Sequence, residues 1–141
     1  MTETVDTQTL LARATAITSA KNTTIKALVR LKTRKHRQQE GRFLIEGVRE
    51  VSRAVAAGVQ LEGVYLCAKF APNTVPDVGN VPVFDVSAAA FSKMSLRQSP
   101  DGVIAVAQRQ QKTLATLPVR PNGLYLVIDG LEKPGNVVAL L

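Results

Sequence analysis

The order of apolar and polar positions predicts alternating helices and strands along most of the chain. Short apolar runs, which are typical of strands, occupy residues 42–46, 61–67, 81–86 and 102–107. Helical spacing of apolar residues, with capping residues or glycines at the ends, predicts helices over 22–39, 48–57 and 87–94. A loop is expected over 71–80, which is rich in proline and glycine. This alternation favours an α/β fold, a three-layer α/β/α sandwich with a mostly parallel sheet.

The pattern also divides the chain into regions. Residues 1–16 are predicted to be a flexible N-terminus, frayed or weakly helical around Leu10 to Ala14, and residues 17–108 form the main domain. A proline-containing linker covers 109–122. The remainder, 123–141, reads as an apolar strand over 124–128, a glycine turn and the start of a helix after Pro134 and Gly135. Because a βαβ unit needs about 30 residues or more, we expect a second domain to begin here and to be almost wholly absent.

Several function classes find no support in the composition. Residues 1–9 contain no apolar signal region, and no apolar run approaches the ~20 residues of a membrane span, so a cytoplasmic protein without membrane contacts is expected. The single cysteine, Cys67, lies in an apolar run and is interpreted as a buried hydrophobe. Ser19 and Ser99 have no hydrolase pattern around them, and glycine-rich phosphate loops are absent from the sequence.

The positive charge is concentrated in one segment. The net charge is +7. Residues 21–42 contain eight lysines and arginines and one acid, Glu40, whereas the ten basic and ten acidic residues elsewhere cancel. A local cationic segment on an otherwise neutral chain is typical of a surface that binds a polyanion.

On the helix predicted over 22–39, the charges fall on one side. Asn22 is the expected cap. Ile25, Leu28, Val29 and Leu31 lie on the apolar side, opposite a band of Lys26, Arg30, Arg34 and Arg37. Lys32 and Lys35 interrupt the apolar side, so either the regular helix ends near them or their stems extend to place the ammonium groups in solvent. A solvated face usually mixes both signs of charge, so the near-absence of acids favours nucleic acid over a merely solvated face. Membrane contact is disfavoured because the apolar side has no Trp or Phe. His36, the only histidine, has no partner for a metal site and is interpreted as a phosphate or base contact.

Several motifs, taken in order, resemble a known family. They are Ile17-Thr18-Ser19, Lys21-Asn22, Arg34-Lys35, Gly41, Phe43-Leu44-Ile45-Glu46-Gly47, Ser99-Pro100-Asp101-Gly102 and Asp129 with Pro134-Gly135-Asn136. Over about residues 17–141 this series resembles the N-terminal substrate-binding domain of the SpoU (TrmH-type) RNA ribose methyltransferases, followed by the first motif of their SPOUT methylase domain.

The resemblance implies a fold, a reaction and partners. The first domain should have the kink-turn/ribosomal-protein-like RNA-binding fold, and the truncated second domain should belong to a knotted methylase that holds S-adenosylmethionine. Family members are usually homodimers through the knotted domain, and they methylate a ribose 2′-hydroxyl in ribosomal or transfer RNA. The 141-residue chain alone is expected to be catalytically inactive, to bind no cofactor or metal, and to be a monomer.

Few site residues carry over from the family. Asn136 matches the first SPOUT motif as a catalytic-site residue, although Val138 stands where the family has a glycine, and the family's arginine would fall beyond Leu141. Glu46 is interpreted as a carboxylate that orders a strand end through a local Lys or Arg. The candidate RNA-binding residues are Lys21, Lys26, Arg30, Arg34, Lys35, His36, Arg37 and Arg42. Two alternatives stay open: a standalone kink-turn RNA binder and a ribosome-associated protein-interaction module.

Overall fold

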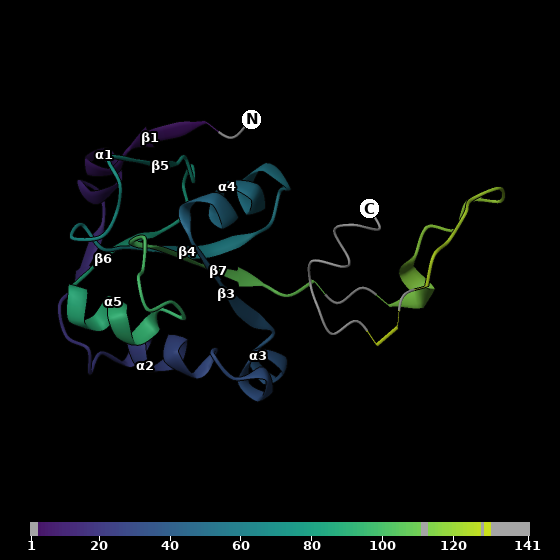
Figure 1. The fold of residues 1–141 in the computed structure, drawn as a ribbon, viewed down its shortest axis with the longest axis horizontal. Helices are drawn as coiled ribbons and strands as arrows, with labels where there is room; N and C mark the ends of the chain where they lie inside the picture. The colour runs from purple at the N-terminus through teal and green to yellow at the C-terminus, as the bar shows by residue number, and fades with distance from the viewer. Residues whose placement is uncertain (1–2, 111–112, 128, 131–141) are drawn as a thin grey trace. The chain divides into compact units, whose positions relative to one another are not determined.

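The computed structural model describes residues 3–110, 113–127 and 129–130. The chain divides into two units, residues 1–110 and 111–141. Within residues 3–110, five helices pack around a five-stranded sheet, and two further strands form a small separate sheet (Figure 1).

The main sheet is mixed. Its strand order is β2 (Thr15–Ile17), β6 (Val83–Val86), β4 (Leu61–Leu66), β7 (Val103–Gln108) and β3 (Arg42–Glu46). The first three strands are parallel, whereas β7 runs antiparallel to both of its neighbours. The α/β fold is therefore confirmed, but the prediction of a mostly parallel sheet is wrong.

The connection through helix α5 (Ala88–Met94) and residues 95–102 returns the chain to the end of the sheet at which β6 finishes. Leu66, at the end of β4, pairs with Asp85 near the end of β6 and with Val103, the first residue of β7. Neighbouring strands β4 and β7 therefore run in opposite directions.

Gly102 makes this entry into β7 possible. Its φ is 76°, in the left-handed region that favours glycine, and a Cβ at this position would overlap the backbone of Ala71. Its carbonyl accepts a hydrogen bond from the Cys67 amide at 3.0 Å. Any side chain at residue 102 would therefore push apart the two segments that this hydrogen bond joins.

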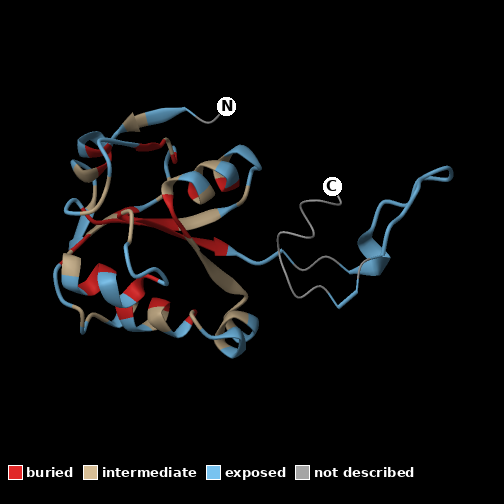
Figure 2. Cartoon of the chain, viewed as in Figure 1, coloured by how far each residue is buried: buried red, intermediate tan, exposed pale blue. Residues whose placement is uncertain are grey.

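Helices cover both faces of the sheet (Figure 1). On one face, α2 (Thr23–Arg30) and α5 contribute Ile25, Leu28 and Phe91 to a core cluster. On the other face, α4 (Val48–Ala56) contributes Val51 and α1 (Thr7–Leu11) contributes Leu10 to a second cluster. The sheet between them is buried, with β7 buried along almost its whole length (Figure 2).

Two regions that were predicted to be irregular or only weakly helical contain helices or strands. Residues 4–17 form β1 (Thr4–Asp6), α1 and β2, instead of a frayed or weakly helical segment, and Leu10 is only 3% exposed. The predicted loop over 71–80 contains β5 (Thr74–Pro76), which pairs antiparallel with β1. These elements are short: β1, β2 and β5 have three residues each and α1 has five, so none of them shows a clear periodic pattern in the sequence.

Other predicted elements are confirmed within a residue or two. These are β3, α4, β4, α5 and β7, and the Ser87 hydroxyl accepts from the Ala90 amide at 3.4 Å as the N-cap of α5. The strand predicted over 81–86 is β6, which begins directly after Pro82 and lies between β2 and β4 in the sheet.

In the second unit, the described residues contain a short 3₁₀ helix, η1 (Leu114–Thr116). The strand predicted over 124–128 is not formed by its described residues, 124–127, and Leu124 and Val127 are exposed. No described segment pairs with them, and an apolar run without a neighbouring strand has no ladder to complete. Ile128 and Asn136 lie outside the described residues.

Candidate nucleic-acid interface

Helix α2 separates the apolar and basic residues of its sequence as predicted. The Asn22 side chain accepts a hydrogen bond from the Thr24 amide at 2.8 Å and caps the helix. Ile25 and Leu28 are buried, whereas Lys26 and Arg30 are exposed. Neither basic side chain makes a hydrogen bond or ion pair with any described residue, so both are free to meet a ligand.

The helix predicted over 22–39 is two helices, α2 and α3 (Arg34–Glu40). Leu31 ends α2, and Thr33 has an extended backbone, with φ −94° and ψ 141°. A continuous helix would have pointed Lys32 toward the apolar side. The break lets the Lys32 ammonium donate to the Ser95 carbonyl at 2.6 Å while Leu31 remains buried.

Arg37 stabilises this break and is not a free cation. Its guanidinium donates to the Leu31 carbonyl at 3.0 Å and to the Lys32 carbonyl at 2.7 Å. These are carbonyls that the end of α2 would otherwise leave without a partner. The structural role of Arg37 was missed in the sequence because it depends on where the helix breaks.

Around α3 the remaining predicted residues differ in exposure. Arg34 and Lys35 are exposed and make no hydrogen bond or ion pair with the residues that the structure describes. The ring of His36 is half-buried and forms a 2.7 Å hydrogen bond with the Thr33 hydroxyl. Gly41, with φ 64°, ends the helix in the left-handed conformation and turns the chain into β3.

Arg42 begins β3 between two carboxylates. Its guanidinium is 2.5 Å from Glu40 and 3.4 Å from Glu62. The hydrogen bond from Arg42 lowers the pKa of the Glu40 carboxyl, and the same bond is the main reason that the pKa of Arg42 is raised. Arg42 is therefore neutralised within the protein, unlike Arg34.

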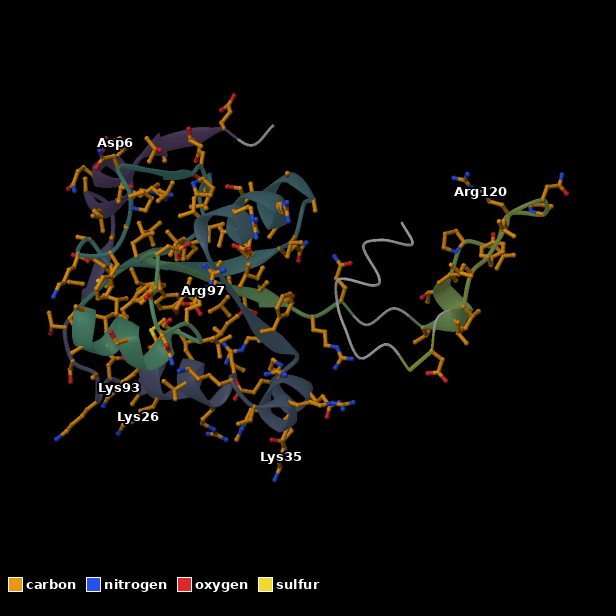
Figure 3. The ribbon with its side chains drawn as sticks, in the orientation of Figure 1. Asp6, Lys26, Lys35, Lys93, Arg97 and Arg120 are labelled. Atoms are coloured by element: carbon orange, nitrogen blue, oxygen red, sulfur yellow. The ribbon has the colours of Figure 1, made fainter. Side chains whose placement is uncertain are left out.

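Two clefts lie on this cationic surface. The first, which we call the arginine cleft, has a volume of about 420 Å³ and is lined by Arg34, Arg37, Gln38, Arg42, Phe43 and Arg109. The second, the lysine cleft, has a volume of about 330 Å³ and is lined by Ala20, Lys21, Ile25, Lys26, Val29, Arg30 and Lys93. Lys26, Lys93 and Lys35 project outward on the side of the molecule formed by α2, α3 and α5 (Figure 3).

The structure thus gathers most of the predicted residues at two places. Lys21, Lys26 and Arg30 line the lysine cleft, and Arg34, Arg37 and Arg42 line the arginine cleft, whereas Lys35 and His36 line neither. Four lining residues to which we assign a role were missed: Lys93, Gln38, Phe43 and Arg109. Lys93 and Arg109 lie far from the basic segment in the sequence. The packing of α5 against α2 places Lys93 at the lysine cleft, and the pairing of β3 with β7 places Arg109 at the arginine cleft.

Glu46 has the structural role expected of it, through different partners. Its carboxylate accepts hydrogen bonds from the Ser95 hydroxyl and from the Leu96 amide, the latter at 2.6 Å. Arg97 donates to the Glu46 backbone carbonyl at 3.1 Å and pairs with Glu50 and Asp101. We call Glu46, Ser95, Leu96, Arg97 and Asp101 the Glu46 cluster. Its polar groups bond to one another, except for the buried Asp101 Oδ1, which has no hydrogen-bond partner among the described residues.

Other chemistry finds no site in the described residues. They contain no group of three or more His, Cys, Asp or Glu side chains placed to hold a metal ion. Cys67 is buried, as predicted for a small hydrophobe. Among the described helices, none is long and apolar enough to cross a membrane.

The fold and the matched region define a substrate-binding domain. Residues 22–105, more than half of the chain, match the MRM3-like substrate-binding domain family. The chain belongs to this family, and the resemblance to SpoU/TrmH-type RNA methyltransferases is confirmed.

The relatives carry consistent names. A tRNA/rRNA methyltransferase of Synechocystis is 30% identical over 89% of this chain and 47% of its own length. The Bacillus subtilis 23S rRNA (guanosine(2553)-2′-O)-methyltransferase RlmP is 29% identical over 89% of this chain and 48% of its own length. The chain spans about half the length of these curated relatives.

Similar solved structures are also methyltransferases. A crystal structure of an RNA 2′-O ribose methyltransferase is 40% identical, with a TM-score of 0.65 over 88% of this chain and 49% of that one. The SpoU methyltransferase AviRb of Streptomyces viridochromogenes, in complex with the cofactor AdoMet, is 20% identical with a TM-score of 0.58 over 74% of this chain and 42% of that one. The latter likeness shows a shared fold.

Proposed function

We propose that residues 17–108 are the domain with which an S-adenosylmethionine-dependent RNA 2′-O-ribose methyltransferase holds ribosomal or transfer RNA. The observation that carries the proposal is the surface of α2 and α3, where Lys26, Arg30 and Arg34 are exposed and have no acceptor among the described residues. Unpaired cations on a rigid helix face meet phosphates without first breaking protein ion pairs. The names of the relatives support an RNA substrate.

The rest of the enzyme is proposed from the family. In this proposal, the layered α/β/α domain is followed by a linker over 109–122 and, from 123, by the start of a knotted SPOUT domain in which Asn136 belongs to the first motif. The whole protein would be a cytoplasmic homodimer through that domain. Residues 1–141 would bind RNA as a monomer without transferring a methyl group.

S-adenosylmethionine does not fit the two cationic clefts. With a sulfonium, an ammonium and one carboxylate, the cofactor has a net positive charge, whereas the side chains that line the arginine and lysine clefts include arginines and lysines and no carboxylate. We therefore assign no cofactor role to these two clefts, and the cofactor pocket is proposed to lie in the other half of the longer relatives.

The test compares charge reversal on the two faces of the sheet. Lys26→Glu with Arg30→Glu removes two unpaired cations from α2, whereas Arg49→Glu with Arg53→Glu makes the same change in net charge on α4, on the opposite face. Fluorescence anisotropy with ribosomal and transfer RNA fragments measures the affinity. We expect the α2 variant to bind on the order of 10- to 100-fold more weakly, and the control to change little.

Salt dependence gives an independent measurement. With about four to six phosphate contacts, the logarithm of affinity should fall with the logarithm of salt at a slope of roughly −3 to −4, and the α2 variant should lose roughly 1 to 2 of that slope. A flat salt response, or equal losses in the α2 and α4 variants with intact circular dichroism, would reject this surface as the RNA site.

A further inference from the structure

The arginine cleft is formed by segments that the sheet brings together. Phe43 lies in β3 beside Arg42, and Arg42 pairs with Gln108 at the end of β7. The next residue, Arg109, donates its backbone amide to the Gly41 carbonyl at 2.7 Å, which extends the pairing of the two strands by one hydrogen bond. This places the Arg109 side chain at the same cleft as Arg34 of α3.

Of the four arginines that line this cleft, two are already bonded within the protein. Arg37 donates to the carbonyls at the end of α2, and Arg42 pairs with Glu40 and Glu62. Arg34 and Arg109 make no side-chain hydrogen bond or ion pair with the described residues. Arg37 and Arg42 are therefore held in place by the protein. The guanidiniums of Arg34 and Arg109 remain free to donate to an anionic ligand, and a phosphate can accept hydrogen bonds from such a planar group.

Phe43 lines the arginine cleft and is not part of the hydrophobic core. The other four aromatic residues of 3–110 form two ring pairs, Tyr65 with Phe84 at 4.7 Å and Phe70 with Phe91 at 6.2 Å between centroids. Phe43 is half-buried, belongs to neither core cluster and has no ring partner among the described residues. A partly exposed ring beside free guanidiniums can stack on a flat base while phosphates are held next to it.

We propose that the arginine cleft captures one unstacked nucleotide of an RNA loop or single strand. The base stacks on Phe43, Arg34 and Arg109 bind the adjoining phosphates, and the Gln38 amide is available to a base edge. The cleft volume of about 420 Å³ lies within the range of small-molecule sites, roughly 300–1,000 Å³. A base inside a duplex is stacked and paired, so a paired RNA cannot place it on Phe43.

This inference rests on the proposed function and makes it more specific. The lysine cleft has lysines and an arginine around an apolar floor of Ala20, Ile25 and Val29, and it has no aromatic ring. It suits phosphates of paired or unpaired RNA alike. The two clefts should therefore respond differently to the structure of the RNA.

The experiment uses the 141-residue chain and two fluorescent RNA probes of equal length, a hairpin with an unpaired loop and a blunt, fully paired duplex. Phe43→Leu removes the ring and keeps an apolar side chain, and Phe43→Tyr keeps the ring. We expect Phe43→Leu to weaken hairpin binding by about 5- to 100-fold, to leave duplex binding unchanged, and Phe43→Tyr to bind as the parent does.

Two charge variants separate this inference from the proposed function. Arg34→Gln with Arg109→Gln should weaken hairpin binding more than duplex binding, whereas Lys26→Gln with Arg30→Gln should weaken both probes equally. If the lysine-cleft variant behaves as expected while Phe43→Leu changes neither probe or both equally, the nucleotide site is wrong and the RNA-binding function stands. If no variant changes either probe, the proposed function fails as well.

A competition experiment tests another class of partner. An acidic peptide, polyglutamate, should displace the hairpin only at charge concentrations far above those at which a single-stranded oligonucleotide does. Equal competition by the two polyanions would overturn the assignment, because it would show that the cleft recognises negative charge without a base. Circular dichroism and thermal melting confirm that each variant is folded.

Discussion

The two ends of strand β3 place arginines in opposite surroundings. At its C-terminal end, Arg97 donates to the Glu46 carbonyl and is 3.3 Å from both Glu50 and Asp101. At its N-terminal end, Arg34 and Arg109 face a cleft and have no side-chain partner among the described residues. Arg97 is itself 42% exposed in its side chain, so exposure does not separate the two groups. The difference teaches that a binding surface is marked by cations without protein acceptors, rather than by the number of cations.

The largest expected effect is a loss of stability at the C-terminal end of β3, where Arg97 is paired within the protein. Glu46→Ala removes the acceptor of the Ser95 hydroxyl and the Leu96 amide from a residue that is only 8% exposed. We expect the free energy of unfolding to fall by about 2–4 kcal/mol, because a buried hydrogen-bonded carboxylate is lost and its donors are left without a partner. Urea denaturation measures this change.

The matched control for that variant is Glu62→Ala, in β4, which removes a partner of Arg42 at the other end of β3. The Glu62 side chain is 30% exposed and reaches Arg42 at 3.4 Å, so its removal should cost less than about 1 kcal/mol. Equal losses in the two variants would show that the Glu46 cluster does not stabilise the fold more than an ordinary surface ion pair.

A second pair of variants separates stability from binding within the basic segment itself. Arg37→Ala should lower the free energy of unfolding by about 1–2 kcal/mol, since two carbonyls at the end of α2 lose their donor. Arg34→Ala should leave the unfolding curve unchanged and weaken RNA binding by about 3- to 10-fold. If Arg37→Ala instead weakened RNA binding without changing stability, Arg37 would belong with the free cations.

The smallest expected effect converts a paired arginine into a free one. Glu40→Gln removes the closer carboxylate of Arg42, and RNA affinity at neutral pH should rise by about twofold. The control, Glu3→Gln, makes the same change in net charge at an exposed residue of another segment and should leave affinity unchanged. An equal rise in both variants would mean that net charge alone matters.

The same ion pair has a definite pH dependence. Because the hydrogen bond from Arg42 lowers the pKa of the folded Glu40 carboxyl, the contribution of this pair to stability is present above the usual pKa of the carboxyl. It is lost as the pH falls through the lowered folded-state value. The difference in stability between the parent and Glu40→Gln should therefore shrink in acid.

The sequence was sufficient for elements with a strong pattern. The spacing of Val48, Val51 and Val55, the cap at Ser87 and the glycine at residue 41 each predicted a helix or its end where the structure has one. The direction of β7 could not be predicted, because an apolar run such as 102–107 is equally compatible with either direction. Strands β1 and β5 were missed because each is only three residues long, too short for a periodic pattern, and each pairs with the other.

The candidate site was predicted in part for a similar reason. Local composition identified the basic segment, and helical spacing placed Lys26 and Arg30 on its outer face. Which arginines are free depends on contacts between distant residues, such as Arg42 with Glu62, that one sequence does not reveal. Arg109 could be assigned to the site only from the register of β3 and β7. Phe43 could be assigned to it only because the structure places this residue in neither core cluster.

The hydrogen bond from Lys32 to Ser95 has a consequence for how tightly RNA can be held. It ties the end of α2 to a residue whose hydroxyl is bonded to Glu46, so the helix that carries Lys26 and Arg30 is fastened to the sheet through the Glu46 cluster. The backbone of this surface is ordered before any ligand arrives. Association then loses little chain entropy at α2, and more of the attraction between guanidinium, ammonium and phosphate remains as net affinity.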